Sequence, residues 1–147
     1  TTDIYYPLPK VDIDQIRMTQ VLNNLISNSL KFTPANGKIT ISVKVEDGFL
    51  RVAVTDNGMG IAENDQKDLF SKYYQIRTNP HELAKKGTGL GLYIVKGIVE
   101  AHGGSVGVIS KPSEGATIYF NIPFEGTGPQ IIQSYSQVVR SASSMIN

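Results

Sequence analysis

Hydrophobic and polar residues follow two periods along this chain, and each change of period predicts a boundary between elements. Strict alternation of apolar and polar residues predicts half-buried strands at 39–45, 50–54, 105–110 and 116–122. Apolar residues at helical spacing predict three helices, at about 12–33, 63–74 and 89–101. The predicted order is therefore a helix, a strand pair, two helices and a second strand pair.

Local signals mark where these elements begin and end. Asp12 and Gln15 have the spacing of a capping box at the start of the first helix, and Pro34 ends it. Asp47-Gly48 is typical of a hairpin turn. His102-Gly103-Gly104 ends the third helix, where a charged His102 would suit the helix C-terminus. We expect Leu69, Phe70 and Tyr73 on one side of the second helix. On the third helix we expect five residues to be buried: Leu90, Ile94, Val95, Ile98 and Val99.

Three segments lack a clear period. Residues 1–11 and 75–86 contain proline and are predicted to be irregular, the second of them as a polar loop. Residues 125–147 begin with a breaker run. Their apolar residues are as consistent with a short docked helix as with a disordered tail. We therefore divide the chain into one domain, 1–124, and a C-terminal tail.

Composition sets limits on function. The 147 residues carry a net charge of +1, so no broad electrostatic argument favours nucleic acid or an anionic membrane. The absence of cysteine excludes disulfides, thiolate metal sites and thiol catalysis. The sequence contains neither a run of about 18 apolar residues, as a membrane span needs, nor a signal peptide. Because it also starts without methionine, we expect a segment of a longer protein.

A polar stripe follows the first predicted helix. Arg17, Gln20, Asn24, Asn28 and Lys31 fall within an arc of roughly 80°. Such a stripe is usually a solvated face, but asparagine is a poor helix former and no capping role explains this pair. An Asn carbonyl suits Mg²⁺, and a lysine one turn further on suits a phosphate. For the stripe alone, both interpretations stay open.

Asp56-Asn57-Gly58-Met59-Gly60 follows a predicted buried strand. As an isolated motif it is ordinary turn chemistry. However, a carboxylate at the end of a buried strand needs a partner, and the exocyclic amino group of a purine would serve. The glycines would let a ligand approach the backbone closely.

A second glycine cluster, Gly87-Thr88-Gly89-Leu90-Gly91-Leu92, leads into the third predicted helix. Free backbone N–H groups at a helix N-terminus bind phosphate well. A dinucleotide fingerprint does not fit, because the glycine spacing differs and a polar loop stands where a strand is required. The P-loop pattern is also absent, since no Gly-Lys-Ser/Thr occurs. Each cluster alone is a weak signal, but the order of the motifs is a strong one.

In this order the motifs resemble the catalytic, ATP-binding domain of sensor histidine kinases, which shares an ATPase group with DNA gyrase B, heat-shock protein 90 and MutL. The resemblance covers about residues 11–124. QVLNNLISNSLKFTP is similar to the asparagine box, DNGMGI to the first glycine box, and LFSKYYQ to the phenylalanine box with Tyr73 replacing a Phe. GTGLGLYIVKGIVEAHGG and SEGATIYFNIP are similar to the second glycine box and the last motif. The implied fold is an α/β two-layer sandwich of the Bergerat type, with a mixed, largely antiparallel sheet packed against about three helices.

The resemblance also implies roles for matching residues. Asn28 would coordinate Mg²⁺, Asn24 would support it, and Lys31 would lie near the phosphates. Asp56 would accept a hydrogen bond from the adenine amino group, with Thr117 completing that contact directly or through water. The full set of expected ATP contacts is Asn24, Asn28, Lys31, Asp56, Gly58, Gly60, Ile61, Tyr74, Lys86, Gly87, Thr88, Gly89, Leu90, Gly91, Leu92 and Thr117.

His81 matches the start of a phosphoacceptor motif in His81-Glu82-Leu83, but the residues after it do not. It also lies in 75–86, the segment that the resemblance identifies as the ATP lid. We interpret His81 as a solvated loop residue, with a phosphate contact as the less favoured alternative. The histidine that accepts the phosphoryl group is therefore expected outside this chain.

The resemblance implies a function in a two-component system. The domain would bind Mg-ATP and donate the γ-phosphoryl group to a histidine on a separate dimerisation domain of the same protein, and indirectly serve a response regulator receiver domain. We expect no contact with nucleic acid, no direct membrane contact, and a cytoplasmic location that is compatible with a membrane-anchored parent. Two alternatives are an ATP-binding pseudokinase or adaptor, and a fragment of a gyrase-like ATPase. The second needs a carboxylate a few residues before the asparagines, and residues 20–23 and 25–27 contain neither Asp nor Glu.

Overall fold

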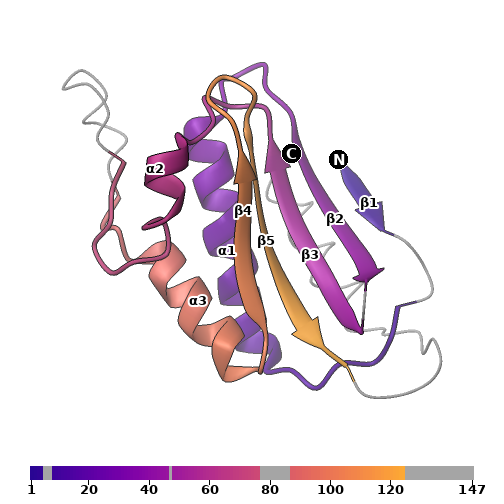
Figure 1. Cartoon of the computed structure of the whole chain (residues 1–147). Helices are drawn as coiled ribbons and strands as arrows, with labels where there is room; N and C mark the ends of the chain where they lie inside the picture. Colours follow the sequence, from indigo (N-terminus) through magenta and orange to yellow (C-terminus); the bar gives the residue numbers. More distant parts are fainter. Residues whose placement is uncertain (5–7, 47, 77–86, 125–147) are drawn as a thin grey trace.

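The computed structural model describes residues 1–4, 8–46, 48–76 and 87–124 (Figure 1). Most of the predicted lid, with His81 and Lys86, and the predicted C-terminal tail lie outside the described residues. The described chain forms two layers, a sheet and a set of helices packed against one of its faces (Figure 1). This arrangement confirms the predicted α/β sandwich.

The sheet has five strands in the order β1-β2-β3-β5-β4. Their bounds are β1 (Thr2–Ile4), β2 (Ile39–Glu46), β3 (Phe49–Asp56), β4 (Ser105–Ser110) and β5 (Ala116–Pro123). The four predicted strands are confirmed, and all of their pairings are antiparallel. β1 pairs with β2 in parallel, so the prediction that residues 1–11 are irregular was wrong there. A segment of three residues is too short to show a period, and only its partner makes it a strand.

The described chain has three helices on one side of this sheet (Figure 1). They are α1 (Gln15–Phe32), α2 (Glu63–Gln66) and α3 (Gly91–Ala101). Of these, α1 and α3 pack against the face of the sheet. α1 begins later than predicted, because Asp14 and not Asp12 is its N-cap, where the carboxylate accepts a 3.0 Å hydrogen bond from the Arg17 N–H. None of the helices that the structure describes is long and apolar enough to cross a membrane.

The second helix is much shorter than predicted. α2 ends at Gln66, and residues 67–73 continue mainly as turns. The Tyr73 N–H donates a 3.0 Å hydrogen bond to the Gly89 carbonyl, and Tyr73 has φ 62°. A continued helix would direct that N–H to a carbonyl of its own preceding turn, so the tertiary contact excludes it. Leu69 is buried whereas Tyr73 is 63% exposed, so the prediction that the two lie on one side of a helix was wrong.

The core lies between the sheet and the pair formed by α1 and α3. Alternate residues of β2, β3 and β5 face it, as does the apolar arc of α1. Its most deeply buried side chains include Val21, Leu25, Ile26, Ile41, Val43, Leu50, Val52, Val54, Val95, Val99, Phe120 and Ile122. α3 packs over the β4 edge of the sheet, and this explains why three residues predicted to be buried on the third helix are only half-buried: Leu90, Ile94 and Ile98.

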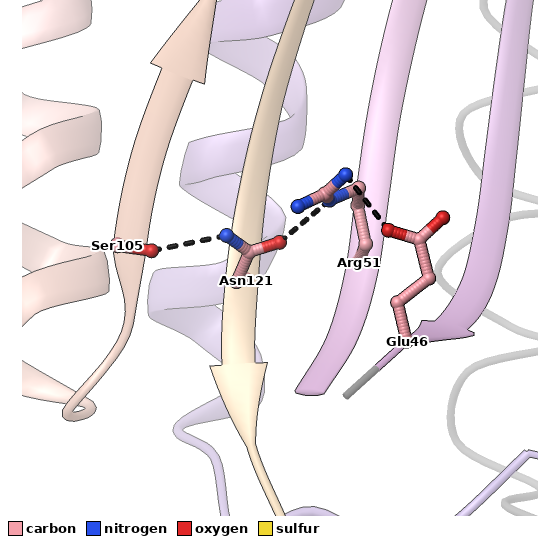
Figure 2. Close-up of polar contacts among 4 residues, drawn as sticks. All are labelled: Glu46, Arg51, Ser105 and Asn121. Carbon is pink, nitrogen blue, oxygen red and sulfur yellow. Dashed lines mark hydrogen bonds and ion pairs between the residues drawn. The ribbon is translucent and has the colours of Figure 1, made fainter. Parts of the chain in front are cut away.

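A row of polar side chains crosses the other face of the sheet (Figure 2). Arg51 on β3 forms a 2.8 Å ion pair with Glu46 on β2 and donates a 2.8 Å hydrogen bond to Asn121 on β5. Asn121 donates in turn to Ser105 on β4 at 3.0 Å, and the Arg51 guanidinium lies over the Tyr119 ring. Because these residues alternate with core residues along their strands, they lie together on the helix-free face.

The contacts of His102 differ from the predicted role of a cation at a helix end. Its Nε2 accepts a 3.0 Å hydrogen bond from the Asp14 N–H, and its Nδ1 lies 2.7 Å from the Ile98 carbonyl oxygen. A ring with its proton on Nδ1 and a lone pair on Nε2 satisfies both contacts. His102 therefore connects the C-terminal end of α3 to the N-cap of α1.

Candidate functional site

A cavity of about 840 Å³ lies between the helices and one end of the sheet. Its walls come from α1, the loop after β3, the turn between β4 and β5, and the start of α3. The predicted contact residues that line it are Asn24, Asn28, Lys31, Asp56, Gly58, Gly60, Ile61, Tyr74, Gly87, Thr88, Gly89, Gly91 and Leu92. Motifs that are far apart in the sequence therefore meet around one space of the size of a small-molecule site.

The polar stripe of α1 divides into two parts. Asn24, Asn28 and Lys31 line the cavity. Arg17 and Gln20 are not part of its wall, and the Arg17 guanidinium donates to the Gln20 side chain at 3.3 Å. The stripe is therefore a cavity wall at its C-terminal end and a solvated face at its N-terminal end.

α1 and the second glycine cluster approach each other closely across the cavity. The Asn24 side-chain amide donates to the Gln20 carbonyl at 3.0 Å, which leaves Oδ1 beside Gly91, where an added Cβ would lie 3.1 Å away. An added Cβ on Gly87 would lie 3.3 Å from Nζ of Lys31. Desolvation by burial lowers the pKa of Lys31 below its ordinary value, so this cation gains from a nearby anion.

Asp56 ends β3 in the cavity wall and is 8% exposed. Its Oδ1 accepts a 2.9 Å hydrogen bond from the Gly58 N–H, and its Oδ2 accepts one of 3.1 Å from the Ser29 hydroxyl. These bonds satisfy a buried carboxylate and leave lone pairs on both oxygens. The sequence analysis missed Ser29. The available signal was a hydroxyl within the buried arc of α1, directly after Asn28.

Two glycines of the first cluster lie where a side chain has no space. An added Cβ on Gly58 would lie 2.5 Å from the Phe32 carbonyl oxygen. Gly60 has φ 70°, and its added Cβ would collide with the Lys111 carbonyl oxygen. Both glycines are thus required by close packing of the loop after β3 against the end of α1 and the turn between β4 and β5.

The turn between β4 and β5 forms a further wall that the sequence analysis did not identify. Ser113 lines the cavity, and its N–H donates to the Met59 carbonyl at 2.7 Å. The Ile61 N–H donates to the Ser110 hydroxyl at 2.9 Å, and the Gln66 side chain donates to the carbonyls of both Ile61 and Ser110. This network holds the first glycine cluster against the turn.

The second glycine cluster ends at the start of α3. Gly89 has φ 71°, and an added Cβ would lie 2.8 Å from the Tyr73 carbonyl carbon. Gly91 is the first helical residue, so the unpaired N–H groups of the first turn begin at the cavity wall. Leu90 is the N-cap and is not part of that wall. This is the geometry that suits an anion.

Tyr74 lines the cavity next to the predicted lid. Its hydroxyl donates a 2.6 Å hydrogen bond to Asp65 on α2. The Gln75 side chain donates to the Gly87 carbonyl at 2.7 Å, so the described residues on either side of 77–86 lie close together.

Thr117 does not reach the cavity, and the structure contradicts its predicted part in the adenine contact. Its hydroxyl oxygen lies 2.9 Å from that of Thr55 on the helix-free face of the sheet. Its neighbours Ala116 and Ile118 line the cavity instead, because successive residues of a strand point to opposite faces. Ala116 stands opposite Asp56 in the pairing of β3 with β5.

The residues around Asn28 fit a metal ion that brings most of its own ligands. Within the described ranges there is no cluster of three or more His, Cys, Asp or Glu that could hold a metal. Asn28 offers a half-buried amide oxygen in the cavity wall. Because Mg²⁺ uses few protein groups and keeps waters and substrate phosphates, one amide oxygen together with a polyphosphate is a suitable donor set.

Residues 13–126 match the family described as histidine kinase-, DNA gyrase B-, and HSP90-like ATPase. The chain belongs to this family. The match covers the asparagine stripe, both glycine clusters and the last strand pair, so it confirms the resemblance inferred from their order.

Relatives of this family member include named sensor kinases. The sensor histidine kinase WalK of Bacillus subtilis (strain 168) is 42% identical over 118 residues, which are 78% of this chain and 19% of WalK. The adaptive-response sensory kinase SasA of Prochlorococcus marinus (strain MIT 9303) is 41% identical over 123 residues, 83% of this chain and 33% of SasA. The chain thus spans a third or less of either relative.

Solved structures of histidine kinases share the fold. Full-length ShkA in complex with AMPPNP has a TM-score of 0.74 and 32% identity, covering 90% of this chain and 27% of ShkA. The nucleotide-free catalytic domain of the histidine kinase ThkA has a TM-score of 0.69 and 32% identity, covering 83% of this chain and 76% of that domain.

Proposed function

We propose that this chain is the catalytic, ATP-binding domain of a two-component sensor histidine kinase. In this proposal it binds Mg-ATP and donates the γ-phosphoryl group to a histidine on a separate dimerisation domain. The buried Asp56 carboxylate carries the proposal, because it has free lone pairs at one side of a cavity whose other side offers amides, Lys31 and a helix N-terminus. The 42% identity to a sensor histidine kinase supports the same reaction class.

The purine would bind against the end of β3. Asp56 would accept a hydrogen bond from the exocyclic amino group of adenine, and Gly58 and Gly60 line the cavity beside it. Ile61 and Ala116 add apolar surface to the same wall. A buried carboxylate discriminates strongly against a base that presents an oxygen there, because the two acceptors would face each other unpaired.

The triphosphate would bind between α1 and α3. Asn28 would hold Mg²⁺ through its amide oxygen, with Asn24 beside it. When bound, the metal ion neutralises charge on the phosphates. Lys31 would supply a positive point charge, and the backbone N–H groups from Gly87 to the first turn of α3 would donate to phosphate oxygens. The contribution of this chain to phosphoryl transfer is thus positioning and electrostatic stabilisation.

The acceptor and the partners would lie elsewhere in the system. His102 already contacts the Asp14 N–H and the Ile98 carbonyl, and His81 lies outside the described residues. The proposal therefore assigns the acceptor to a helical dimerisation domain of the parent protein, from which a response regulator receiver domain takes the phosphoryl group. The domain would work in the cytoplasm, whether or not its parent is anchored in a membrane.

Isothermal titration with a non-hydrolysable ATP analogue, with and without Mg²⁺, tests nucleotide binding. We expect Asn28→Ala to remove the dependence on Mg²⁺ and Asp56→Asn to weaken recognition of adenine. Asn23→Ala is the matched control, because Asn23 is an exposed residue of α1 that does not line the cavity. Failure of the folded wild-type domain to bind the analogue would overturn the proposal.

Adding a histidine-bearing dimerisation domain in trans tests phosphoryl transfer. We expect phosphohistidine on that domain and none on this chain. Binding of ATP without any transfer would favour the alternative of a pseudokinase or adaptor.

A gyrase-like ATPase, the second alternative, requires a general base that α1 does not supply. α1 contains neither Asp nor Glu from Gln15 to Phe32, so no carboxylate precedes Asn24 or Asn28 on the helix. Rapid ATP turnover by the isolated domain would contradict this argument and favour the ATPase.

A further inference from the structure

Ser29 and Asp56 form a buried hydroxyl–carboxylate pair in the cavity wall. Ser29 is 3% exposed and Asp56 is 8% exposed. The Ser29 hydroxyl on α1 donates to Oδ2 of Asp56 on β3 at 3.1 Å, across 27 residues of sequence. Oδ1 accepts from the Gly58 N–H at 2.9 Å, so each carboxylate oxygen is held by a different segment.

The strand next to Asp56 offers no replacement for this hydroxyl. Ala116 stands opposite Asp56 on β5 but has no polar side-chain atom. Thr117, the next residue, turns its hydroxyl to Thr55 on the helix-free face. Among the residues that the structure describes, Ser29 is thus the one side chain hydrogen-bonded to Asp56.

We propose that Ser29 is a positioning residue that sets the preference of this site for a purine with an exocyclic amino group. The inference rests on the proposed function, in which Asp56 accepts a hydrogen bond from that group. The terminal torsion of an aspartate is broad, so a free carboxylate samples many orientations. A donor on each oxygen restricts the plane of the carboxylate and leaves further lone pairs for the ligand. Ser29 acts through Asp56 and needs no contact with the nucleotide.

A merely structural role for Ser29 would have a different signature. Loss of a buried hydrogen bond lowers the folded fraction, which weakens the binding of every nucleotide by the same factor. Loss of carboxylate positioning weakens only those ligands that donate to Asp56. The ratio of affinities for ATP and for purine riboside triphosphate, which lacks the amino group, therefore distinguishes the two roles.

The experiment measures both dissociation constants by isothermal titration for wild type, Ser29→Ala and Ser29→Cys. Cysteine keeps roughly the size of serine but is a weak donor, and it provides a second variant if alanine impairs folding. Thr19→Val is the matched control, because Thr19 is also on α1 and its hydroxyl bonds only the Gln15 carbonyl at 2.8 Å, away from the cavity.

We expect wild type and Thr19→Val to prefer ATP by about tenfold or more, and both Ser29 variants to retain a preference of only about two- to threefold. Folded Ser29 variants that keep the wild-type ratio of affinities would overturn the proposed role of Ser29. That outcome would leave the proposed function of the domain standing. A wild-type domain that binds neither nucleotide, or binds both equally, would instead overturn the proposed function or its adenine contact.

Discussion

The hydroxyl oxygens of Thr55 and Thr117 lie 2.9 Å apart on the face of the sheet that carries no helix. Each is the sequence neighbour of a cavity residue, Asp56 or Ala116, and the two cavity residues pair in the same register. Because strand residues alternate between faces, a shift of one position separates the pair in the cavity wall from the pair on the outer surface.

Thr117→Val is therefore expected to leave nucleotide affinity unchanged. The substitution removes a cross-strand hydroxyl contact, whose loss lowers the free energy of unfolding by about 0.2–1 kcal/mol. Titration with ATP and chemical denaturation measure the two effects. A loss of ATP affinity comparable to that of Asp56→Asn would show that Thr117 contributes to the adenine contact after all.

Gly60→Ala is expected to lower both stability and nucleotide affinity. The residue has φ 70°, which costs a side chain about 1–2 kcal/mol, and the added Cβ also collides with the Lys111 carbonyl. Gly48→Ala is the control, because Gly48 has φ 81° and an added Cβ would have no atom within 4 Å. That variant is therefore destabilised by its backbone conformation but by no collision. Equal losses of stability for the two variants would contradict the packing argument.

Gly97→Ala is expected to stabilise the domain by about 0.5–1 kcal/mol, since glycine in a helix interior is less favourable than alanine. Gly97 is exposed on α3, and an added Cβ meets no atom within 4 Å.

Gly91→Ala on the same helix brings a Cβ to 3.1 Å from Oδ1 of Asn24 and should weaken ATP binding. Thermal unfolding and titration check both, and a destabilised Gly97→Ala would refute the first expectation.

Binding of ATP is expected to cause proton uptake at alkaline pH. Desolvation by burial lowers the pKa of Lys31 from 10.5, and nearby phosphates favour the protonated form and so raise the pKa again. Where the pH approaches the lowered pKa of Lys31, the free domain has lost part of this proton and regains it on binding, and the uptake falls as the pH is lowered.

Calorimetric titration in two buffers of different ionisation enthalpy measures this uptake. Lys31→Arg is expected to show none, because arginine stays protonated over this range. Uptake of equal size in that variant would assign the proton to another group.

Periodicity was sufficient where an element depends on its own residues. The alternating runs at 39–45 and 50–54 became β2 and β3. The two strands pair as an antiparallel hairpin in which Val45 stands opposite Leu50. The spacing of Asn24 and Asn28 likewise places both on one side of α1, whatever packs against the other side.

Elements that depend on distant partners were predicted less well. β1 is a strand because β2 lies beside it in parallel, and no period in its three residues could indicate this. The second helix does not extend through Tyr73 as predicted, because the Tyr73 N–H bonds the distant Gly89 carbonyl. In contrast, the direction of Thr117 was available from the alternation of Ile118, Phe120 and Ile122 in the same strand.

The sequence by itself determined the family, through the resemblance of its ordered motifs, and the order of the described elements other than β1, because those elements follow from residue spacing. Only the tertiary structure decided that Ser29 holds Asp56 and that the β4–β5 turn supports the first glycine cluster. Such contacts depend on where α1 and the strands come to lie against one another. That placement results from packing of the whole core and not from the period of any single segment.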